Sequence, residues 1–289
     1  RAPIPVLCVG NLVAGGAGKT PTAIAVGRRL LAKGRKVHFL TRGYGGSARG
    51  PLSVDPARHD ATTVGDEALL LAQVAPTWVA RNRYRAALLA AEAGAEVLVL
   101  DDGLQNPRLA KTLSLVVIDA GFGVGNGRVM PAGPLREPVA HGLGRADAVV
   151  LIGDMPKDAD PALLGRTTAG KPLLRAWLVP DEAAAHLAGQ TVVAFAGIGR
   201  PQKFFATLLS MGCKLAATAS FPDHHRYRPE EIMRLAETAH QAKALLVTTA
   251  KDFVRLPPEA RAMVQQVGVN LEFAEVAALD RLLRHLPHA

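Results

Sequence analysis

The sequence predicts an α/β fold in which helices cover a mainly parallel sheet, and two observations lead to this class. The first is composition: the chain has 289 residues, of which 49% are hydrophobic and only 4% are aromatic. Abundant Ala, Leu, Val and Gly with few aromatic residues is typical of buried parallel strands and their helices, and unlike an all-β sandwich. The second observation is an alternation of short apolar runs with segments of helical spacing.

In the first half of the chain, short β-branched apolar runs are expected to form buried strands. These runs are Val6–Val9, Val37–Leu40, Val97–Leu100, Leu115–Ile118 and Ala148–Ile152. Segments with helical spacing lie between them, at Pro21–Lys33, Asp66–Ala75 and Asn82–Ala93. Because strands and helices follow one another in succession, the crossovers should be right-handed and the strands parallel. Ligands of such a sheet bind beyond the carboxyl ends of its strands, so polar motifs at those positions are candidates for a functional site.

The second half of the chain shows the alternation again, after a change of composition. Beyond Gly153 the sequence is punctuated by Pro and Gly, and Leu173–Val179 is an extended segment between two prolines. Further strands are expected at Val192–Ala196, Leu215–Ala219 and Leu245–Thr249, with helices at Gln202–Met211 and Pro229–Ala242. We therefore predict a core domain over 1–165, a linker over 166–190 and a smaller C-terminal α/β domain over 191–289.

The net charge indicates which binding partners to expect, and the cysteine content indicates which structural sites are not expected. A formal net charge of +9 and a pI near 9.9 favour anionic partners, namely nucleotide phosphates, nucleic acid or a membrane surface. The two cysteines, Cys8 and Cys213, are too far apart in sequence to suggest a zinc site or a disulfide framework, so reduced thiols are expected. The sequence contains no run of about 18 or more apolar residues, which excludes a membrane-spanning helix within it.

A glycine-rich segment follows the first predicted strand and precedes the first helix. This order of strand, loop and helix is the context of a phosphate-binding P-loop. The predicted nucleotide-binding residues are Gly15, Gly16, Ala17, Gly18, Lys19, Thr20 and Pro21. Glycines let backbone N–H groups converge on phosphate oxygens, Lys19 supplies positive charge to the β- and γ-phosphates, and the Thr20 hydroxyl is a ligand for Mg²⁺. ATP and Mg²⁺ are therefore the expected cofactors.

The loop departs from the commonest P-loop pattern at one position. The first glycine of that pattern would fall at Val13, so the loop is closer to the Gly-Gly-x-Gly-Lys-Thr variant. The same variant occurs in ATPases that dimerise over DNA, which typically carry a further lysine where Ala14 stands here. A partitioning-type or chaperone-type ATPase switch is therefore an alternative function, and Ala14 disfavours it.

Two pairs of acidic residues are candidates for the metal side of the site. Asp101 and Asp102 end the third predicted strand, as in a Walker B strand whose carboxylate holds the Mg²⁺ shell. Adjacent carboxylates repel one another unless a cation lies beside them, and a divalent metal would provide it. Asp66 and Glu67 stand at a predicted helix start, where acidic residues are ordinary capping residues, so capping competes with catalysis there. Gln105 follows the first pair and is placed to orient a phosphate or a water.

An ordered set of short motifs resembles one known family. The motifs are Gly10-Asn11-Leu12, Thr41-Arg42-Gly43-Tyr44-Gly45-Gly46, Val64-Gly65-Asp66-Glu67, Asp101-Asp102-Gly103-Leu104-Gln105, Pro134-Leu135-Arg136-Glu137 and Phe221-Pro222-Asp223-His224-His225. Together they make the chain similar to the tetraacyldisaccharide 4′-kinases, the lipid A kinases of Gram-negative envelopes, from the first strand to Lys251-Asp252. The resemblance implies two α/β domains joined by a small β linker. It also implies transfer of the γ-phosphoryl group of ATP to the 4′-hydroxyl of a tetraacylated glucosamine disaccharide 1-phosphate, giving lipid IVA.

The resemblance further implies roles for individual residues. Asp66 is expected to be the base for the sugar hydroxyl with His224 beside it, and Lys19 to stabilise the transferring phosphoryl group. His225 is the alternative to His224. Metal ligands are expected among Thr20, Asp101, Asp102 and Glu67. Substrate or phosphate contacts are expected from Arg42, Tyr44, Gln105, Arg136 and Glu137.

The arginines have an ordinary alternative, because in so basic a chain an arginine is often a solvated surface residue. This applies to Arg42 and Arg136 individually. The Arg81–Arg85 cluster, which includes Asn82 and Tyr84, is expected to face the acceptor or anionic lipid, or else to be a solvated helix face.

The resemblance implies a lipid-linked disaccharide as substrate and the cytoplasmic face of the bacterial inner membrane as the location, with peripheral or monotopic attachment. Members of the family carry a membrane-associating helix before the first strand, and this sequence begins too late to contain it. We expect a monomer without a nucleic-acid partner, since no basic stretch is interleaved with aromatic residues. A kinase of a soluble metabolite is a further alternative, because a P-loop does not specify the acceptor.

Overall fold

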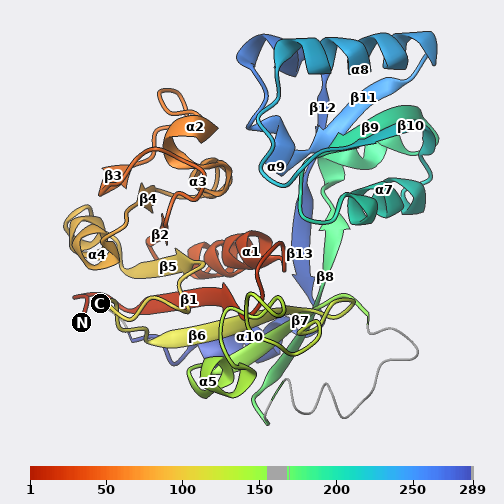
Figure 1. Ribbon diagram of the computed structural model, residues 1–289. Coiled ribbons are helices and arrows are strands. Elements are labelled where there is room, and N and C mark those ends of the chain that lie inside the picture. Colours follow the sequence, from red (N-terminus) through yellow and green to blue (C-terminus); the bar gives the residue numbers. More distant parts are fainter. Residues whose placement is uncertain (155–167, 169, 288–289) are drawn as a thin grey trace.

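The computed structural model describes residues 1–154, 168 and 170–287, and the chain forms two sheets (Figure 1). The large sheet has nine strands in the order β13-β8-β7-β6-β1-β5-β2-β4-β3, and the small sheet has four in the order β10-β9-β11-β12. In Figure 1 the large sheet lies below and the small sheet above, and β8 and β13 extend between them. The predicted boundary between residues 165 and 166 lies outside the described residues.

The large sheet is built around parallel strands that are buried on both faces. Its strands are β1 (Val6–Asn11), β2 (Val37–Thr41), β3 (Leu52–Ser53), β4 (Thr77–Val79), β5 (Val97–Asp101), β6 (Leu113–Asp119), β7 (Ala148–Ile152), β8 (Leu173–Pro180) and β13 (Val269–Phe273). β1 pairs in parallel with β5 and β6, whereas the edge strands β3 and β13 pair antiparallel with β4 and β8. Every residue of β1, β2, β5 and β6 is buried, as their continuous apolar runs predict.

Helices cover both faces of the large sheet. One apolar core contains side chains of α1 (Lys19–Leu31), α3 (Asp66–Ala72) and α10 (Val276–Leu283). The other contains side chains of α4 (Arg83–Glu92) and α5 (Val139–Gly144). The short helix α2 (Ala61–Val64) leads into α3. The two cores therefore fix the carboxyl ends of the parallel strands and the helix starts that follow them at one edge of the sheet.

Residues 182–267, here called the small-sheet unit, form a second layered structure. Its parallel strands are β9 (Thr191–Ala196), β10 (Lys214–Ser220), β11 (Leu245–Thr249) and β12 (Gln265–Val267). α7 (Pro201–Ser210) and the 3₁₀ helix η1 (Glu182–Leu187) cover one face. α8 (Pro229–Gln241) and the 3₁₀ helix η2 (Pro258–Met263) cover the other. After β11 comes α9 (Ala250–Phe253), and the next residue, Val254, packs against Val64 and Leu69 beside the large sheet.

The last strand and helix of the chain return to the large sheet. β13 pairs with β8, and Leu279 and Leu283 of α10 are buried in the core that also contains α1. The predicted range 191–289 placed both elements in the smaller domain, because nothing in the sequence specifies which sheet an isolated apolar run will join. The small-sheet unit is thus inserted between β8 and β13 (Figure 1). The domain limits otherwise stay a prediction.

The α/β class predicted from the sequence is confirmed, with parallel strands and covering helices in both layered structures. The predicted strands and helices are all present, with ends shifted by a few residues. The structure adds elements that were not predicted, chiefly the short strands β3, β4 and β12 and the returning pair β13 and α10.

Gly27 of α1 packs closely against Phe39 of β2, and a substitution at Gly27 tests this contact. A Cβ added at Gly27 would lie 2.4 Å from Cζ of Phe39, which is wholly buried and has no room to move. We expect Gly27→Ala to lower the free energy of unfolding by about 1–3 kcal/mol, measured by urea denaturation. Gly144→Ala is the control, because nothing lies within 4 Å of an added Cβ in that helix. Equal unfolding midpoints for the two variants would contradict the packing.

Candidate active site

The segment predicted to bind phosphates is a turn between β1 and α1. Gly15 and Gly18 have φ of 102° and 87°, left-handed values that residues with a Cβ rarely adopt. Gly18 is also the N-cap of α1, so the first N–H groups of the helix are directed out of its start. On its other side the loop is held by a hydrogen bond of 2.8 Å from Ala14 N to Pro134 O. A phosphate chain is the ligand that suits such a turn.

The end of β5 brings a carboxylate to the start of α1. Thr20 Oγ1 donates a hydrogen bond of 2.8 Å to Asp101 Oδ2. The other oxygen, Asp101 Oδ1, is buried and has no hydrogen-bond partner among the described residues. Burial, followed by the nearby charge of Glu67, raises the pKa of Asp101 to about 7. A buried carboxylate oxygen without a partner, next to a hydroxyl, fits Mg²⁺, because this ion prefers oxygen ligands and favours their ionised form.

The other predicted metal ligands have protein partners. In the part of the chain that the structure describes, no group of three or more His, Cys, Asp or Glu side chains could hold a metal ion. Mg²⁺ does not need such a group, since it usually keeps waters and phosphate oxygens in its shell. Glu67 Oε1 lies 3.1 Å from Lys251 Nζ, and Asp102 is paired with an arginine. Thr20 and Asp101 are therefore the best placed of the predicted ligands.

Asp102 differs from Asp101 because basic groups surround it. Arg136 Nη1 and Nη2 donate to its two carboxylate oxygens at 2.7 and 3.1 Å, and Lys19 Nζ lies 3.8 Å from Oδ2. Burial raises the pKa of Asp102, but the charges of Lys19 and Arg136 outweigh this effect and hold the pKa below its ordinary value. Asp102 is thus an ionised group that holds Lys19 beside the phosphate-binding turn.

Gln105 and Glu137, predicted to contact a phosphate or the substrate, belong to the same network. Gln105 Nε2 donates to Asn11 O at 2.9 Å and to Glu137 Oε1 at 2.8 Å. Glu137 also pairs with Arg145. These contacts join the end of β1 to the segment that carries Arg136. In this structure the two side chains therefore position other residues of the site.

The arginines of the Arg81–Arg85 cluster differ in burial: two are exposed and one is buried. Arg81 and Arg85 are exposed, and Asn82 caps α4 by accepting a hydrogen bond from Arg85 N at 3.2 Å. Arg83 is only 6% exposed, and its guanidinium donates to the carbonyl of Asp102 at 3.3 Å. This contact of Arg83 was not predicted, because a cluster of arginines on a helix does not reveal which one points inward.

Asp66 is buried where the small-sheet unit meets the start of α3. Gly65 precedes it with φ of 85°, and a Cβ at Gly65 would lie 2.5 Å from Tyr44 O, so a glycine is needed there. Asp66 Oδ1 accepts a hydrogen bond of 2.8 Å from Glu67 N, and Oδ2 faces the small-sheet unit. His224 Nδ1 lies 3.0 Å from Oδ2, so the predicted pair of Asp66 and His224 is in contact.

Two cationic side chains of the small-sheet unit also face Asp66. Lys251 Nζ lies 3.9 Å and Arg255 Nε 3.4 Å from Asp66 Oδ2. Burial raises the pKa of Asp66, but the hydrogen bond from His224 and the charges of Lys251 and Arg255 outweigh it and lower the pKa overall. Asp66 is therefore a carboxylate at neutral pH and can accept a proton. Sequence analysis named neither cation as a site residue, although both follow the end of a predicted strand, where ligands bind.

The structure brings His224, and not His225, to Asp66. His225 Nε2 lies 3.0 Å from Glu231 Oε2, and its ring stacks on Phe221 with 4.7 Å between the ring centres. His225 is thus engaged within the small-sheet unit. This arrangement agrees with the choice of His224 made from the sequence.

Tyr44 and Arg42 lie on the segment that follows β2, and Tyr44 lies beside His224. The ring centre of Tyr44 is 5.0 Å from that of His224, yet the Tyr44 side chain is 61% exposed. Arg42 is also exposed. Of the predicted substrate contacts, these two are open to solvent and so remain accessible to a substrate.

A second contact joins the small-sheet unit to the phosphate-binding turn. Arg200 Nη2 donates to Asp119 Oδ2 at 2.6 Å and to Gly16 O at 3.2 Å, and its guanidinium lies 5.1 Å from the ring centre of Phe122. Lys203 Nζ also donates to Asp119, whose side chain is 7% exposed. The small-sheet unit therefore contacts both the phosphate-binding turn and Asp66, the candidate base.

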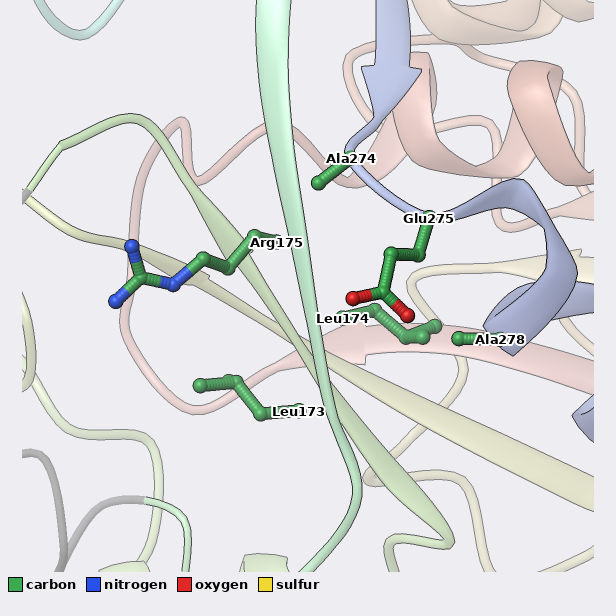
Figure 2. Close-up of a pocket in the computed structure, with 6 residues that line it drawn as sticks. All are labelled: Leu173, Leu174, Arg175, Ala274, Glu275 and Ala278. Atoms are coloured by element: carbon green, nitrogen blue, oxygen red, sulfur yellow. The ribbon is translucent and has the colours of Figure 1, made fainter.

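A cavity of about 240 Å³ lies away from these residues, against β8 and the connection from β13 to α10 (Figure 2). It is lined by Leu173, Leu174, Arg175, Ala274, Glu275 and Ala278. In Figure 2 the Arg175 side chain extends on the opposite side of the β8 ribbon from Glu275. None of the predicted site residues lines this cavity, so it is not the candidate active site.

The motifs suggest that the chain is related to a known family, and a match to that family is found. Residues 1–287 match the family described as tetraacyldisaccharide-1-P 4′-kinase. The chain belongs to this family. Curated tetraacyldisaccharide 4′-kinases of Gluconacetobacter diazotrophicus and Paramagnetospirillum magneticum are 57% and 56% identical to it, over 98% of this chain and 85% and 86% of their own lengths.

A solved structure also resembles this member of the tetraacyldisaccharide-1-P 4′-kinase family. It is an "apo" form of LpxK from Aquifex aeolicus in complex with ATP, with a TM-score of 0.76 and 28% sequence identity. The match covers 99% of this chain and 89% of that chain. The P-loop type of fold and the resemblance predicted from the sequence are thereby confirmed.

The contact between Arg200 and Asp119 leads to a prediction for stability. Arg200→Ala removes a charged hydrogen bond to a buried carboxylate together with the contacts to Gly16 and Phe122, and should lower the free energy of unfolding by about 1.5–3 kcal/mol. Lys203→Ala should cost less than about 1 kcal/mol, because the Lys203 side chain is 54% exposed. Chemical denaturation of both variants measures the difference, and a larger loss for Lys203→Ala would refute this ranking.

Proposed function

We propose that the chain transfers the γ-phosphoryl group of ATP to the 4′-hydroxyl of tetraacyldisaccharide 1-phosphate, giving lipid IVA in lipid A biosynthesis. The observation that carries this proposal is the family match over residues 1–287. A P-loop alone does not specify the acceptor, whereas the family is named for its acceptor. The contact between Asp66 and His224 supports the proposal, because a switch ATPase has no sugar hydroxyl to deprotonate.

We propose that residues Gly15 to Pro21 bind the phosphates of ATP. The backbone N–H groups at the start of α1 would hold the phosphate oxygens, and Lys19 would place its charge on the β- and γ-phosphates. When bound beside Thr20 and Asp101, Mg²⁺ would neutralise charge on the phosphates. Asp102 and Arg136 then keep Lys19 in position, since Asp102 contacts both cations.

Asp66 is proposed to accept the proton of the 4′-hydroxyl. Its lowered pKa keeps it ionised at neutral pH, and the loose transition state of phosphoryl transfer requires little proton removal early in the reaction. His224 would donate a hydrogen bond from Nδ1 to Asp66 Oδ2 and so orient the carboxylate. Asp66 is 2% exposed, so the small-sheet unit must withdraw before a sugar hydroxyl can reach it.

Arg42 and Tyr44 are proposed to contact the lipid-linked disaccharide. Both are exposed next to His224 or on the same segment, and an arginine offers paired donors to a phosphate. Arg136, Gln105 and Glu137 would act by holding Asp102 and the end of β1 instead of contacting the substrate.

We propose that the protein works as a monomer on the cytoplasmic face of the inner membrane. A net charge of +9 suits an anionic membrane surface that carries the lipid substrate. Across the described residues, none of the helices has the length and apolar character needed to cross a bilayer.

Transfer of label from γ-labelled ATP to tetraacyldisaccharide 1-phosphate, in detergent with Mg²⁺, tests the reaction and its base together. The intact chain should form labelled lipid, and Asp66→Asn should lower the rate by about 10²- to 10⁴-fold because it cannot accept the proton. Label released only as inorganic phosphate by the intact chain would point to a switch ATPase. An unaltered rate for Asp66→Asn would remove Asp66 from the mechanism.

The same assay separates the histidines and tests the phosphate-binding lysine. Lys19→Ala should lower kcat by about 10²- to 10³-fold, since it removes a charge that stabilises the transferring group. His224→Ala should lower kcat at least about tenfold, whereas His225→Ala should retain most activity. If His225→Ala abolished turnover while His224→Ala stayed within about twofold, the assigned partner of Asp66 would be wrong.

A further inference from the structure

Arg255 is a buried arginine that sequence analysis did not single out. It follows α9 in a turn, and its side chain is 6% exposed. Its guanidinium donates to backbone carbonyls of Gly197 at 2.9 Å, His225 at 3.2 Å and Lys251 at 3.1 Å. One side chain therefore ties the two loops of Gly197 and His225 to the segment that carries Lys251 and Arg255 itself.

Asp252 and Tyr227 hold Arg255 in this position. Arg255 Nη2 donates to Asp252 Oδ1 at 2.8 Å, and the same oxygen accepts bonds from Gly197 N at 2.9 Å and Tyr227 Oη at 2.6 Å. Asp252 Oδ2 accepts a bond from Thr249 Oγ1 at 2.5 Å, and Asp252 is wholly buried. Burial, followed by the charge of Asp252, raises the pKa of Tyr227, so its hydroxyl stays a donor. The Arg255 guanidinium is therefore oriented by the Asp252 carboxylate, both oxygens of which accept hydrogen bonds.

The loops that Arg255 joins lie at one edge of the small sheet. Gly197 follows β9, the segment with His224 and His225 follows β10, and Lys251 follows β11. These strands are parallel, so their carboxyl ends meet at the same edge. This edge faces Asp66, as the contacts of His224, Lys251 and Arg255 with its carboxylate establish.

The carbonyls that Arg255 binds belong to, or adjoin, the residues that contact Asp66 and Glu67. His225 is next to His224, which lies 3.0 Å from Asp66, and Lys251 lies 3.1 Å from Glu67. The position of His224 depends on this support, because its backbone has φ of 59°, a left-handed value that is costly for a histidine. A guanidinium that binds the next carbonyl along the chain restrains that backbone.

We propose that Arg255 is a positioning residue for phosphoryl transfer, which presents His224 and Lys251 to Asp66 and Glu67 by binding the loops at the carboxyl edge of the small sheet. This inference rests on the proposed roles of Asp66 and His224. Arg255 touches neither phosphate nor sugar in this role. It acts through His224 and Lys251 and through its own Nε, which lies 3.4 Å from Asp66 Oδ2, and its loss displaces the partners of the proposed base while the phosphate-binding turn stays intact.

Steady-state kinetics of the chain, with ATP, Mg²⁺ and tetraacyldisaccharide 1-phosphate in detergent, tests the role. Arg255→Met removes the donors at similar side-chain length and should lower kcat by about 10- to 100-fold, with KM for ATP within about threefold of the intact chain. Arg255→Lys, which keeps the charge and some donors, should recover part of the lost kcat. Arg234→Met is the matched control, because Arg234 is exposed on α8, and its kcat should be unchanged.

A double-mutant cycle with His224→Ala distinguishes positioning from a general loss of structure. If Arg255 acts partly by positioning His224, Arg255→Met should lower kcat by a smaller factor in the His224→Ala background than in the intact chain. An equal loss in both backgrounds would overturn the proposal, as would a folded Arg255→Met variant with kcat within about twofold of the intact chain.

Variants of the supporting residues decide the outcome if Arg255→Met does not fold. Tyr227→Phe keeps the ring and removes only the hydroxyl bound to Asp252, so kcat should fall while the melting temperature changes little. Unchanged kcat in both Tyr227→Phe and Arg255→Lys would overturn the positioning role. If the intact chain formed no labelled lipid, the proposed function would fail, and this inference would fail with it.

Discussion

The carboxylate of Asp66 is the group on which the arrangement of the site depends. It belongs to the start of α3 beside the large sheet, but its Oδ2 is contacted by His224, Lys251 and Arg255 of the small-sheet unit. Burial alone would favour the protonated acid, and the opposing charges keep it ionised. The ionised state of Asp66 therefore depends on contacts between two parts of the chain that are distant in sequence.

The parallel strands of the two sheets explain why the candidate site residues lie close together. In the large sheet, the carboxyl ends of β1, β5 and β6 carry the phosphate-binding turn, Asp101 and Asp119. In the small sheet, the ends of β9, β10 and β11 carry the loops that Arg255 joins. Each sheet thus offers its ligand-binding edge to the other. The cavity beside β8 lies outside this junction, which agrees with its lack of site residues.

The sequence predicted those parts of the site whose chemistry lies in consecutive residues. The proximity of Lys19 and Thr20 to the end of β5 could be predicted because the order of strand, loop and helix fixes their geometry locally, whereas their roles stay predictions. The residues next to Asp66 in the sequence could not distinguish a helix cap from a base. His224 was named only because of the family resemblance. Arg83 and Arg255 were missed, because the direction of an arginine depends on partners distant in sequence. The return of β13 to the large sheet was missed for the same reason: strand pairing across a long separation leaves no local pattern.

The insertion of the small-sheet unit between β8 and β13 has a mechanical consequence. Its two connections to the large sheet are the neighbouring antiparallel strands β8 and β13, so both connections lie on the same side of the unit. A swing about these strands would carry Arg200 away from Gly16 and His224 away from Asp66 in one movement. Such a movement would break and restore the contacts of both the phosphate-binding turn and Asp66 together, so that access to the two places would be coupled.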